Sequence, residues 1–313
     1  MSPGPEAVER AATLLGDRAR RDVALGPFTT YKVGGPAALL VQAGSAEHLA
    51  AVAAAVAETG LDVLVVGKGS NLLVAEAGFG GVAVVLGDAF AGVDVAGTRV
   101  RAGGAAALPV VARHTVRAGL TGFEWAVGVP GSVGGAVRMN AGGHGSDMAA
   151  SLVSAEIVDL GAGGAARTVP AADLALGYRH SAVGPAQVVV AATVGLAVGD
   201  RAAGERTLSE IVAWRRANQP GGQNAGSVFT NPPGDSAGRL IDASGCKGLR
   251  RGTASVSTKH ANFFQADPGG SADDVWALMT EVRRRVAEAT GVELVPETRM
   301  VGFPADSQAE IEG

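Results

Sequence analysis

Apolar residues recur every three or four positions along "SAEHLAAVAAAVAETG" (45–60), which a serine opens and a glycine closes. This spacing gathers the apolar side chains on one face of a helix, and serine and glycine are favoured at its two ends. Two short apolar runs follow at 63–67 and 81–86, separated by a glycine-rich turn. Runs of this length are typical of buried strands. Residues 1–85 are therefore predicted to form a small α+β unit.

The same kinds of signal continue from about residue 98, although the sequence itself does not repeat. A helix is predicted at 107–119, and strands are predicted at 98–103, 154–160, 166–170 and 187–197. Several strands with one covering helix indicate a second unit over residues 86–203.

A third unit is predicted over residues 204–303. It begins with a helix at 204–220 that proline ends, and it contains a serine-capped amphipathic helix at 271–291 and a closing strand at 292–302. The polar and acidic residues 304–313 are expected to form a disordered tail. The predicted fold class is therefore α+β.

Composition and charge narrow the range of partners. The formal net charge is −4, so the chain offers no basic field for a polyanion, and we expect no nucleic-acid partner. No apolar run reaches the roughly 18 residues of a membrane span, and the charged start of the chain lacks the apolar core of a secretory leader. A single cysteine, Cys246, excludes an internal disulfide. We expect a cytoplasmic protein with a small-molecule partner and no membrane partner.

Glycine is unusually frequent: 47 residues, many of them gathered in two loops at 65–74 and 128–145. Small side chains leave the backbone N–H groups of such loops free to face an anion. Neither loop has the dinucleotide pattern G-x-G-x-x-G, because Leu72 stands where the third glycine belongs, and neither ends in Gly-Lys-Ser/Thr. Each loop alone could be a tight turn or a phosphate cradle. Two of them in one chain favour a pyrophosphate held between two subdomains.

Two pairs of residues are further candidates. Tyr178 and Arg179 are neighbours in a predicted extended segment, so one would face the core and the other a cavity, although a plain surface arginine is the simpler interpretation. Glu297 and Arg299 lie two apart in the predicted last strand, hence on one face. They could pair structurally, or they could line a pocket as a carboxyl group and a fork of donors.

Ser227, in "NAGSVFTNP" (224–232), lacks the G-x-S-x-G elbow of a hydrolase, so a nucleophilic role is not favoured. The stretch "STKHANFF" brings Lys259, His260 and Asn262 together beside two aromatic residues. The histidines of the chain show no metal-ligand spacing, and no metal site is predicted.

Six motifs, taken in order, carry a resemblance to a known family: "TTYKVGGPA", "GKGSNLLV", "GVPGSVGGAVRMNAG", "GYRHS", "GSVFTNP" and "PETRMVG". They resemble motifs of the UDP-N-acetylenolpyruvoylglucosamine reductases of bacterial cell-wall synthesis, over about residues 27–302. The resemblance implies two subdomains of the FAD-binding fold shared with the vanillyl-alcohol oxidase group, followed by a C-terminal substrate-binding domain.

The same resemblance implies non-covalent FAD, held by backbone amides of the two glycine loops, and NADPH as co-substrate. The residues implied to contact FAD are Tyr31, Val33, Gly67, Gly69, Ser70, Asn71, Leu72, Gly131, Ser132, Gly134, Gly135, Asn140 and Gly142.

The implied reaction reduces UDP-N-acetylglucosamine enolpyruvate to UDP-N-acetylmuramate, with hydride passed from NADPH through FAD to the terminal alkene carbon. Negative charge then spreads into the substrate carboxylate, and the neighbouring carbon needs a proton. By resemblance, Arg179 and Glu297 stabilise that charge, with Glu297 protonated because a bare carboxylate would raise the barrier. Ser227 matches the proton donor, since so basic a carbon accepts a proton even from a weak acid that is well placed.

Substrate contacts are implied for Tyr178, Arg215, Asn231, Lys259, His260, Asn262 and Arg299. Two departures from the family limit what can be transferred. One branch carries a substrate-clamping tyrosine in an extra loop between Arg179 and Ser227, and this chain has no tyrosine there. Asn218 stands where relatives have a lysine, so no role of that lysine is transferred. The protein is expected to be a monomer.

Two other interpretations remain at this point. Another FAD-dependent oxidoreductase of the same fold, acting on an alcohol or a sugar, would lack the set Arg179, Ser227 and Glu297. A non-catalytic nucleotide-binding protein would have lost at least one of the three. All three are present, which favours the reductase.

Overall fold

The computed structural model describes residues 4–304, and its contacts divide the chain into two compact units. Unit 1 comprises Met1–Val23, Ala38–Lys68 and Gly80–Arg215, and unit 2 comprises Ala24–Ala37, Gly69–Phe79 and Arg216–Gly313. The first two predicted domains thus share one unit, and two short early segments join the C-terminal part of the chain. The three-domain boundaries stay a prediction. The predicted disordered tail lies, apart from Pro304, outside the described residues.

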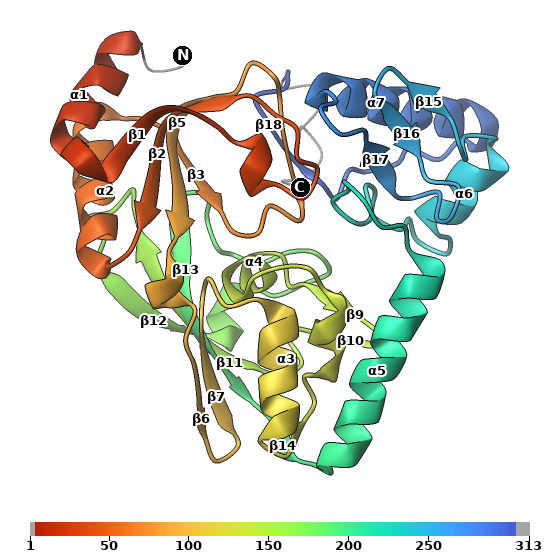
Figure 1. Cartoon of the computed structure of the whole chain (residues 1–313), viewed down its shortest axis with the longest axis horizontal. Helices are drawn as coiled ribbons and strands as arrows, with labels where there is room; N and C mark the ends of the chain where they lie inside the picture. Colours follow the sequence, from red (N-terminus) through yellow and green to blue (C-terminus); the bar gives the residue numbers. More distant parts are fainter. Residues whose placement is uncertain (1–3, 305–313) are drawn as a thin grey trace. The chain divides into compact units, whose positions relative to one another are not determined.

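Unit 1 contains a four-stranded sheet in the order β1-β2-β5-β3. Its strands and helices are β1 (Ala19–Ala24), β2 (Pro36–Ala43), β3 (Val63–Val66), β5 (Phe79–Leu86), α1 (Pro5–Leu15) and α2 (Ala46–Thr59). Figure 1 shows α1 and α2 side by side along this sheet. The predicted helix and both strands are confirmed: Ser45 accepts a hydrogen bond from His48 N, and Gly60 ends α2 at φ 66°.

A five-stranded antiparallel sheet follows in unit 1, in the order β12-β11-β13-β7-β6. The strands are β6 (Val93–Ala96), β7 (Arg99–Gly103), β11 (Leu152–Asp159), β12 (Ala166–Pro170) and β13 (Gln187–Gly195). Two-stranded pairs join β8 (Leu120–Thr121) to β14 (Ala197–Val198) and β9 (Gly142–Gly143) to β10 (Ser146–Asp147). The helices are α3 (Leu108–Arg117), α4 (Val133–Arg138) and α5 (Arg201–Asn218). The strands and helices predicted for this region are confirmed.

Two hydrophobic clusters form the core of unit 1. One packs α1 and α2 against the first sheet and also takes Val158 and Val188 from the second sheet, so it joins the two sheets. The other surrounds Phe123 and Trp125, whose ring centroids lie 5.3 Å apart. This second cluster includes Val133, the first residue of α4, so the second glycine loop is anchored directly in the core.

Unit 2 is built around α7 (Ala272–Thr290) and a three-stranded antiparallel sheet. Its other elements are β4 (Leu72–Val74), α6 (Ala237–Ala243), β15 (Arg250–Arg251), β16 (Ala254–Val256), β17 (Phe264–Ala266) and β18 (Arg299–Val301). Ser271 caps α7 by accepting from Asp273 N (3.1 Å), and Gly291 ends it, as predicted. β4 pairs in parallel with β18, which explains why an early segment belongs to this unit. Figure 1 draws α6, α7 and the small sheet in cyan to blue.

The predicted strand at 292–302 is wrong in its extent. Only Arg299–Val301 form a strand, and Pro296 makes an isolated bridge with Phe229. Proline has no N–H to donate to a ladder, so it interrupts strand pairing at this point. The glycine-rich stretch 128–145 also contains more structure than a loop, because residues 133–138 form α4.

No helix in the described part of the chain is both long enough and apolar enough to cross a membrane.

Candidate functional site

The first glycine loop, residues 67–71, follows β3. Gly69 has φ 58°, and a Cβ there would lie 2.2 Å from Phe28 O, so only glycine fits. Thr30 fixes the loop by donating from its backbone N (3.1 Å) and its Oγ1 (3.3 Å) to Gly69 O. Within residues 4–304, the backbone amides of the five loop residues donate no hydrogen bond to another residue. They are therefore available to a ligand.

Gly67, in the part of the first loop that belongs to unit 1, meets the second glycine loop. A Cβ on Gly67 would lie 2.7 Å from Ser132 Oγ, so the absence of a side chain at residue 67 allows this approach. Ser132 also caps α4 by accepting from Gly135 N (3.5 Å). The amides of Gly131 and Ser132 lie in buried residues and have no hydrogen-bond partner among the described residues.

The amides of Gly131 and Ser132 can donate to a bound anion or to water, as a phosphate cradle requires. Gly134 is different, because its amide donates to Gly104 O (2.9 Å) and a Cβ would lie 3.0 Å from Val189 O. Gly134 therefore serves close packing of α4 against β13, and its N–H is already engaged.

Asn140 and Gly142 follow α4. Asn140 is 3% exposed and has φ 39°. Its Nδ2 donates to Gly177 O (2.8 Å) and Asp147 Oδ2 (3.2 Å), and its Oδ1 accepts from Ala149 N (2.9 Å). The side chain is thus engaged within unit 1, and the backbone N of Asn140 donates to Val137 O (3.3 Å). At Gly142, a Cβ would lie 2.6 Å from Asp147 Cβ, so glycine allows the β9–β10 hairpin to close.

Tyr178 and Arg179 are the two central residues of a tight turn, and the prediction of an extended segment is wrong. Gly177 N donates to His180 O (3.1 Å), and His180 N donates to Gly177 O (3.2 Å). Arg179 has φ 57°, the left-handed region that most side chains avoid. Its Cζ lies 5.1 Å from the centroid of the Tyr178 ring, which is 63% exposed. The turn therefore brings the two side chains together instead of sending them to opposite faces.

Ser227 lies in unit 2, on a segment that is tied to its neighbours by backbone bonds. It forms an antiparallel bridge with Phe263, and the next residue, Val228, donates from its N to Asn262 O (2.9 Å). Gly226 precedes it with φ 77°. The serine itself is half-buried, so its position is defined while part of its surface stays accessible.

Glu297 is tied to the same segment. Its N donates to Val228 O (2.8 Å), while Asn71 Nδ2 donates to Glu297 O (3.0 Å) and Arg299 N donates to Asn71 O (3.0 Å). The backbone that carries the serine and the backbone that carries Glu297 are therefore adjacent in unit 2. Arg299 begins β18 whereas Glu297 precedes it, so the two do not lie in one strand as predicted. Burial nevertheless alternates from residue 293 to residue 301, and Glu297 and Arg299 are both half-buried, as expected for residues on one face.

Three predicted substrate contacts of unit 2 have internal partners. Asn262 is 2% exposed; its Oδ1 accepts from Phe229 N (3.0 Å) and its Nδ2 donates to Phe229 O (2.8 Å). Asn231 Oδ1 accepts from the first amide of α6 (3.1 Å). Lys259 is exposed and its Nζ donates to Arg216 O. The Asn262 side chain thus holds the backbone of Phe229 in place. Asn231 and Lys259 keep exposed surface.

Burial lowers the pKa of three further basic groups. It lowers the pKa of Arg215, and it lowers the pKa of His260, whose ring centroid stands 4.8 Å from that of Phe263. The pKa of His144 is lowered first by burial and then by the charge of Arg215. His144 sits at the tip of the β9–β10 hairpin, 5.2 Å from the Trp214 ring of α5. Arg215 and His144 therefore form one cluster within unit 1.

Tyr31 and Val33 face the core of unit 2, at 0% and 4% exposed, and burial raises the pKa of Tyr31. Both belong to the segment that includes Thr30, whose N and Oγ1 donate to Gly69 O. The remaining predicted loop residues, Ser70 and Leu72, bracket Asn71, and Leu72 begins β4.

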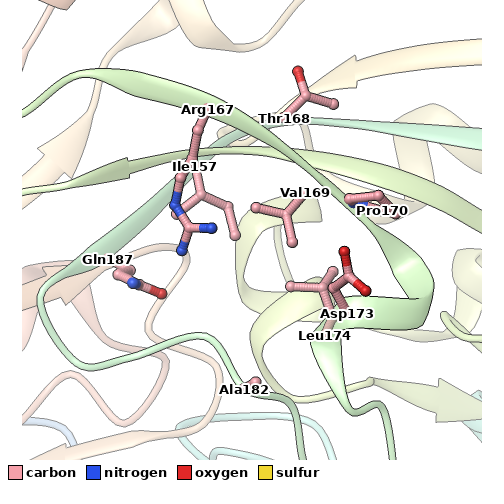
Figure 2. Close-up of a pocket in the computed structure, with 9 residues that line it drawn as sticks. All are labelled: Ile157, Arg167, Thr168, Val169, Pro170, Asp173, Leu174, Ala182 and Gln187. Carbon is pink, nitrogen blue, oxygen red and sulfur yellow. The ribbon is translucent and has the colours of Figure 1, made fainter.

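A cavity of about 270 Å³ opens elsewhere in unit 1, beside β11, β12 and the turn Ala171–Leu174. Figure 2 shows the side chains of Arg167, Val169 and Leu174 pointing into it. None of the predicted site residues lines this cavity. It is therefore separate from the two glycine loops.

Two residues next to predicted site residues were not identified by the sequence analysis. Ser181 Oγ donates to Arg138 O (2.6 Å), and Asp147 accepts from Asn140. The only signal for Ser181 was its place at the end of "GYRHS". Within residues 4–304, no cluster of three or more histidine, cysteine or carboxylate side chains is arranged to hold a metal ion.

Comparison with protein families gives two matches. Residues 37–169 match a family described as FAD binding domain, and residues 218–301 match one described as UDP-N-acetylenolpyruvoylglucosamine reductase, C-terminal domain.

Curated relatives cover nearly the whole chain. The UDP-N-acetylenolpyruvoylglucosamine reductase of Acidiphilium cryptum is 44% identical over 92% of this chain and 93% of its own length. The enzyme of the same name from Heliobacterium modesticaldum is 44% identical, over 91% of this chain and 90% of its own. Among solved structures, UDP-N-acetylenolpyruvylglucosamine reductase from Thermus caldophilus aligns with a TM-score of 0.79 and 36% identity, covering 91% of this chain and 99% of that one.

Proposed function

The chain belongs to the UDP-N-acetylenolpyruvoylglucosamine reductase family, and from this premise we propose how its own residues carry out the reaction. The enzyme reduces UDP-N-acetylglucosamine enolpyruvate to UDP-N-acetylmuramate in peptidoglycan synthesis, using FAD and NADPH. The expected α+β fold, with an FAD-binding part and a C-terminal reductase domain, is confirmed. The observation that carries the function is 44% identity over 92% of the chain.

The glycine loops fit the diphosphate of FAD. The unpaired amides of Gly131, Ser132 and residues 67–71 are donors that suit phosphate oxygens, and Gly67 leaves the space that a side chain would fill. When bound, FAD supplies the two-electron chemistry that links NADPH oxidation to alkene reduction. The proposed role of Tyr31, Val33, Asn140 and Gly142 in binding FAD rests on the family motifs. These residues would act through their backbone or through their packing.

We assign proton donation to Ser227. The carbon that must be protonated is strongly basic, so the position of the serine hydroxyl matters more than its acidity. Three features support placement: the bridge to Phe263, the bond from Val228 N to Asn262 O, and the turn at Gly226. They hold the serine backbone while its side chain stays half-buried.

We assign stabilisation of the substrate's developing negative charge to Arg179 and Glu297. Arg179 presents a guanidinium fork that suits a carboxylate. Glu297 acts as a protonated hydrogen-bond donor, because an ionised carboxyl group would oppose the charge that forms. Its backbone bond to Val228 O supports this role, since it places Glu297 beside the segment that carries Ser227.

The remaining polar residues are proposed to hold the rest of the substrate. Arg215, Lys259 and Arg299 carry the positive charge that a diphosphate needs, and Asn231, His260 and Tyr178 offer polar or aromatic surface. Asn262 is proposed to act through Phe229, because its amide group is already engaged there.

We also propose that the protein works in the cytoplasm as a monomer and binds no nucleic acid. The net charge of −4 supports the last point. Light scattering during size-exclusion chromatography tests the oligomeric state, and a stable dimer would contradict the proposal.

The function is tested with the purified holoenzyme. We expect a yellow protein that releases FAD on denaturation. NADPH should bleach the flavin absorbance, and the enolpyruvyl UDP-sugar should restore it. A colourless protein that cannot be reconstituted with FAD would contradict the assignment, and so would flavin that the sugar does not reoxidise.

Ser227→Ala tests the proton donor. The variant should keep its rate of flavin reduction by NADPH but lose about 10²-fold or more in reoxidation by the enolpyruvyl sugar. The matched control is Ser244→Ala, which removes a buried hydroxyl without a hydrogen-bond partner from the same unit. Normal reoxidation in Ser227→Ala would remove the assignment.

A further inference from the structure

Two side chains attach the turn that carries Arg179 to the rest of unit 1, beside a backbone bond from Ala182 N to Leu174 O (2.7 Å) that closes the surrounding segment. The closing residues of the turn, Gly177 and His180, exchange two backbone bonds, at 3.1 and 3.2 Å. Asn140 Nδ2 reaches the first end by donating to Gly177 O (2.8 Å). Ser181 follows the second end, and its Oγ donates to Arg138 O (2.6 Å). Both ends are therefore fastened to the C-terminal end of α4, at its last residue Arg138 and at Asn140.

Asn140 is bound more firmly than a surface asparagine. It is 3% exposed, and besides Gly177 it contacts Asp147 Oδ2 (3.2 Å) and Ala149 N (2.9 Å). Its own φ is 39°, a conformation that asparagine tolerates better than most residues. One amide group thus connects the end of α4, the β9–β10 hairpin and the turn.

Ser181 is also largely buried, at 9% exposed. Its Oγ accepts from Val183 N (3.3 Å) in addition to donating to Arg138 O. The hydroxyl therefore bridges the chain that leaves the turn and the segment that precedes Asn140.

The backbone of Arg179 shows that this attachment matters. Arg179 occupies the third position of the turn with φ 57°, where glycine or asparagine is usual. A strained conformation persists only where its surroundings enforce it. The proposed function of the guanidinium explains why an arginine stands at this position. The hydrogen bonds at the two ends of the turn constrain its backbone conformation.

We propose that Asn140 and Ser181 are positioning residues that together set the orientation of Arg179 for the reduction of the enolpyruvyl group. This inference rests on the proposed role of Arg179. It gives the side chain of Asn140 a task distinct from the cofactor contact that the family motif assigns to this position.

Ser181→Ala is the principal test, because it deletes one hydroxyl and leaves the packing nearly unchanged. Reduction of the flavin by NADPH should stay within about twofold, while reoxidation by the enolpyruvyl sugar slows by about tenfold or more, since small displacements of a catalytic group cost rates of this order. Ser181→Thr keeps the hydroxyl and should restore most of the rate. Ser209→Ala is the control, because it removes an equivalent hydroxyl-to-carbonyl bond on α5.

A double-mutant cycle separates positioning from general damage. In the Arg179→Ala background, adding Ser181→Ala should slow reoxidation no further, because the group that Ser181 orients is gone. If Ser181→Ala slows both backgrounds by the same factor, the positioning role is overturned. If Arg179→Ala itself leaves reoxidation unchanged, the proposed function of Arg179 fails instead.

Hydrogen exchange provides a readout that does not depend on turnover. In the holoenzyme, the amides of residues 177–181 should exchange about tenfold faster in Ser181→Ala than in the wild type or in Ser209→Ala. Unchanged exchange of this segment in Ser181→Ala would overturn the positioning role.

Discussion

Two buried asparagines support the two parts of the proposed catalytic machinery in different ways. Asn262, in unit 2, uses both ends of its amide on one residue, Phe229, next to the serine segment. Asn140, in unit 1, distributes its amide over Gly177, Asp147 and Ala149. The exposed fractions are nearly equal, 2% and 3%, so burial does not distinguish them. What differs is how many segments of chain each one joins.

The difference indicates where sequence changes alter stability and where they alter rate. Around Ser227, backbone bonds from Val228 and Glu297 supplement the side-chain bonds of Asn262, so the segment keeps several attachments. Around Arg179, side chains hold both ends of the turn, next to a single backbone bond from Ala182 N to Leu174 O (2.7 Å). We therefore expect Asn262 to contribute mainly to folding of unit 2 and Asn140 mainly to catalysis.

The largest expected effect concerns Glu297. Glu297→Ala should lower the rate of reoxidation by the enolpyruvyl sugar by about 10²–10³-fold, the usual cost of losing one donor to a developing anion. Glu297→Gln keeps a hydrogen-bond donor and should retain about tenfold more activity than the alanine variant. Stopped-flow absorbance of the flavin measures both.

The control for Glu297 is Glu293→Gln, an exposed glutamate of the same segment, which should behave as the wild type. Equal rates for Glu297→Gln and Glu297→Ala would contradict a protonated glutamate. Both variants keep the backbone bond to Val228, so neither is expected to displace Ser227.

The next largest effect concerns Asn262 and tests the comparison directly. Asn262→Ala leaves the N–H and C=O of Phe229 unpaired in a residue that is 1% exposed, so the free energy of unfolding should fall by about 1–3 kcal/mol. Asn140→Ala should cost less stability, because Ala149 is exposed and water can replace the lost bond. Urea unfolding of both variants measures this. A larger stability loss for Asn140→Ala would reverse the contrast between the two asparagines.

Local patterns predicted the helices and most strands, because those signals lie within one segment. The serine cap and terminal glycine gave the limits of α2 and α7 to within one residue. Pairing of distant segments was not accessible in this way. The parallel pairing of β4 with β18 and the bridge from Pro296 to Phe229 depend on contacts across about two hundred and about seventy residues, which no local period encodes.

The candidate site shows the same division. The motifs supplied the identities of Arg179, Ser227 and Glu297, but they suggested an extended segment around Arg179, where a turn is formed. Alternation of side chains is a rule for strands only, and nothing in "GYRHS" revealed that Gly177 and His180 pair. The role of Asn140 was equally hidden, since its partners lie seven to thirty-seven residues away.

A smaller effect on stability tests the backbone of the arginine turn. Arg179→Gly and Arg179→Ala remove the same guanidinium, yet the glycine variant should be more stable by about 1 kcal/mol, because glycine adopts a positive φ without strain. Both variants should be equally slow in reoxidation. Urea unfolding of the pair gives the difference, and an alanine variant as stable as the glycine variant would show that position 179 is unstrained.

The smallest effect concerns His144, on the hairpin that also provides Asp147, which accepts a hydrogen bond from Asn140. Burial and the charge of Arg215 lower the pKa of His144 in the folded state. As the pH falls through the ordinary histidine value of about 6.5, the unfolded chain takes up a proton that the folded chain resists, so the free energy of unfolding decreases. His144→Gln lacks this titration and should lose less stability than the wild type between pH 7 and pH 5, when both are unfolded in urea. Identical pH dependence in the two proteins would show that the hairpin tip does not resist protonation.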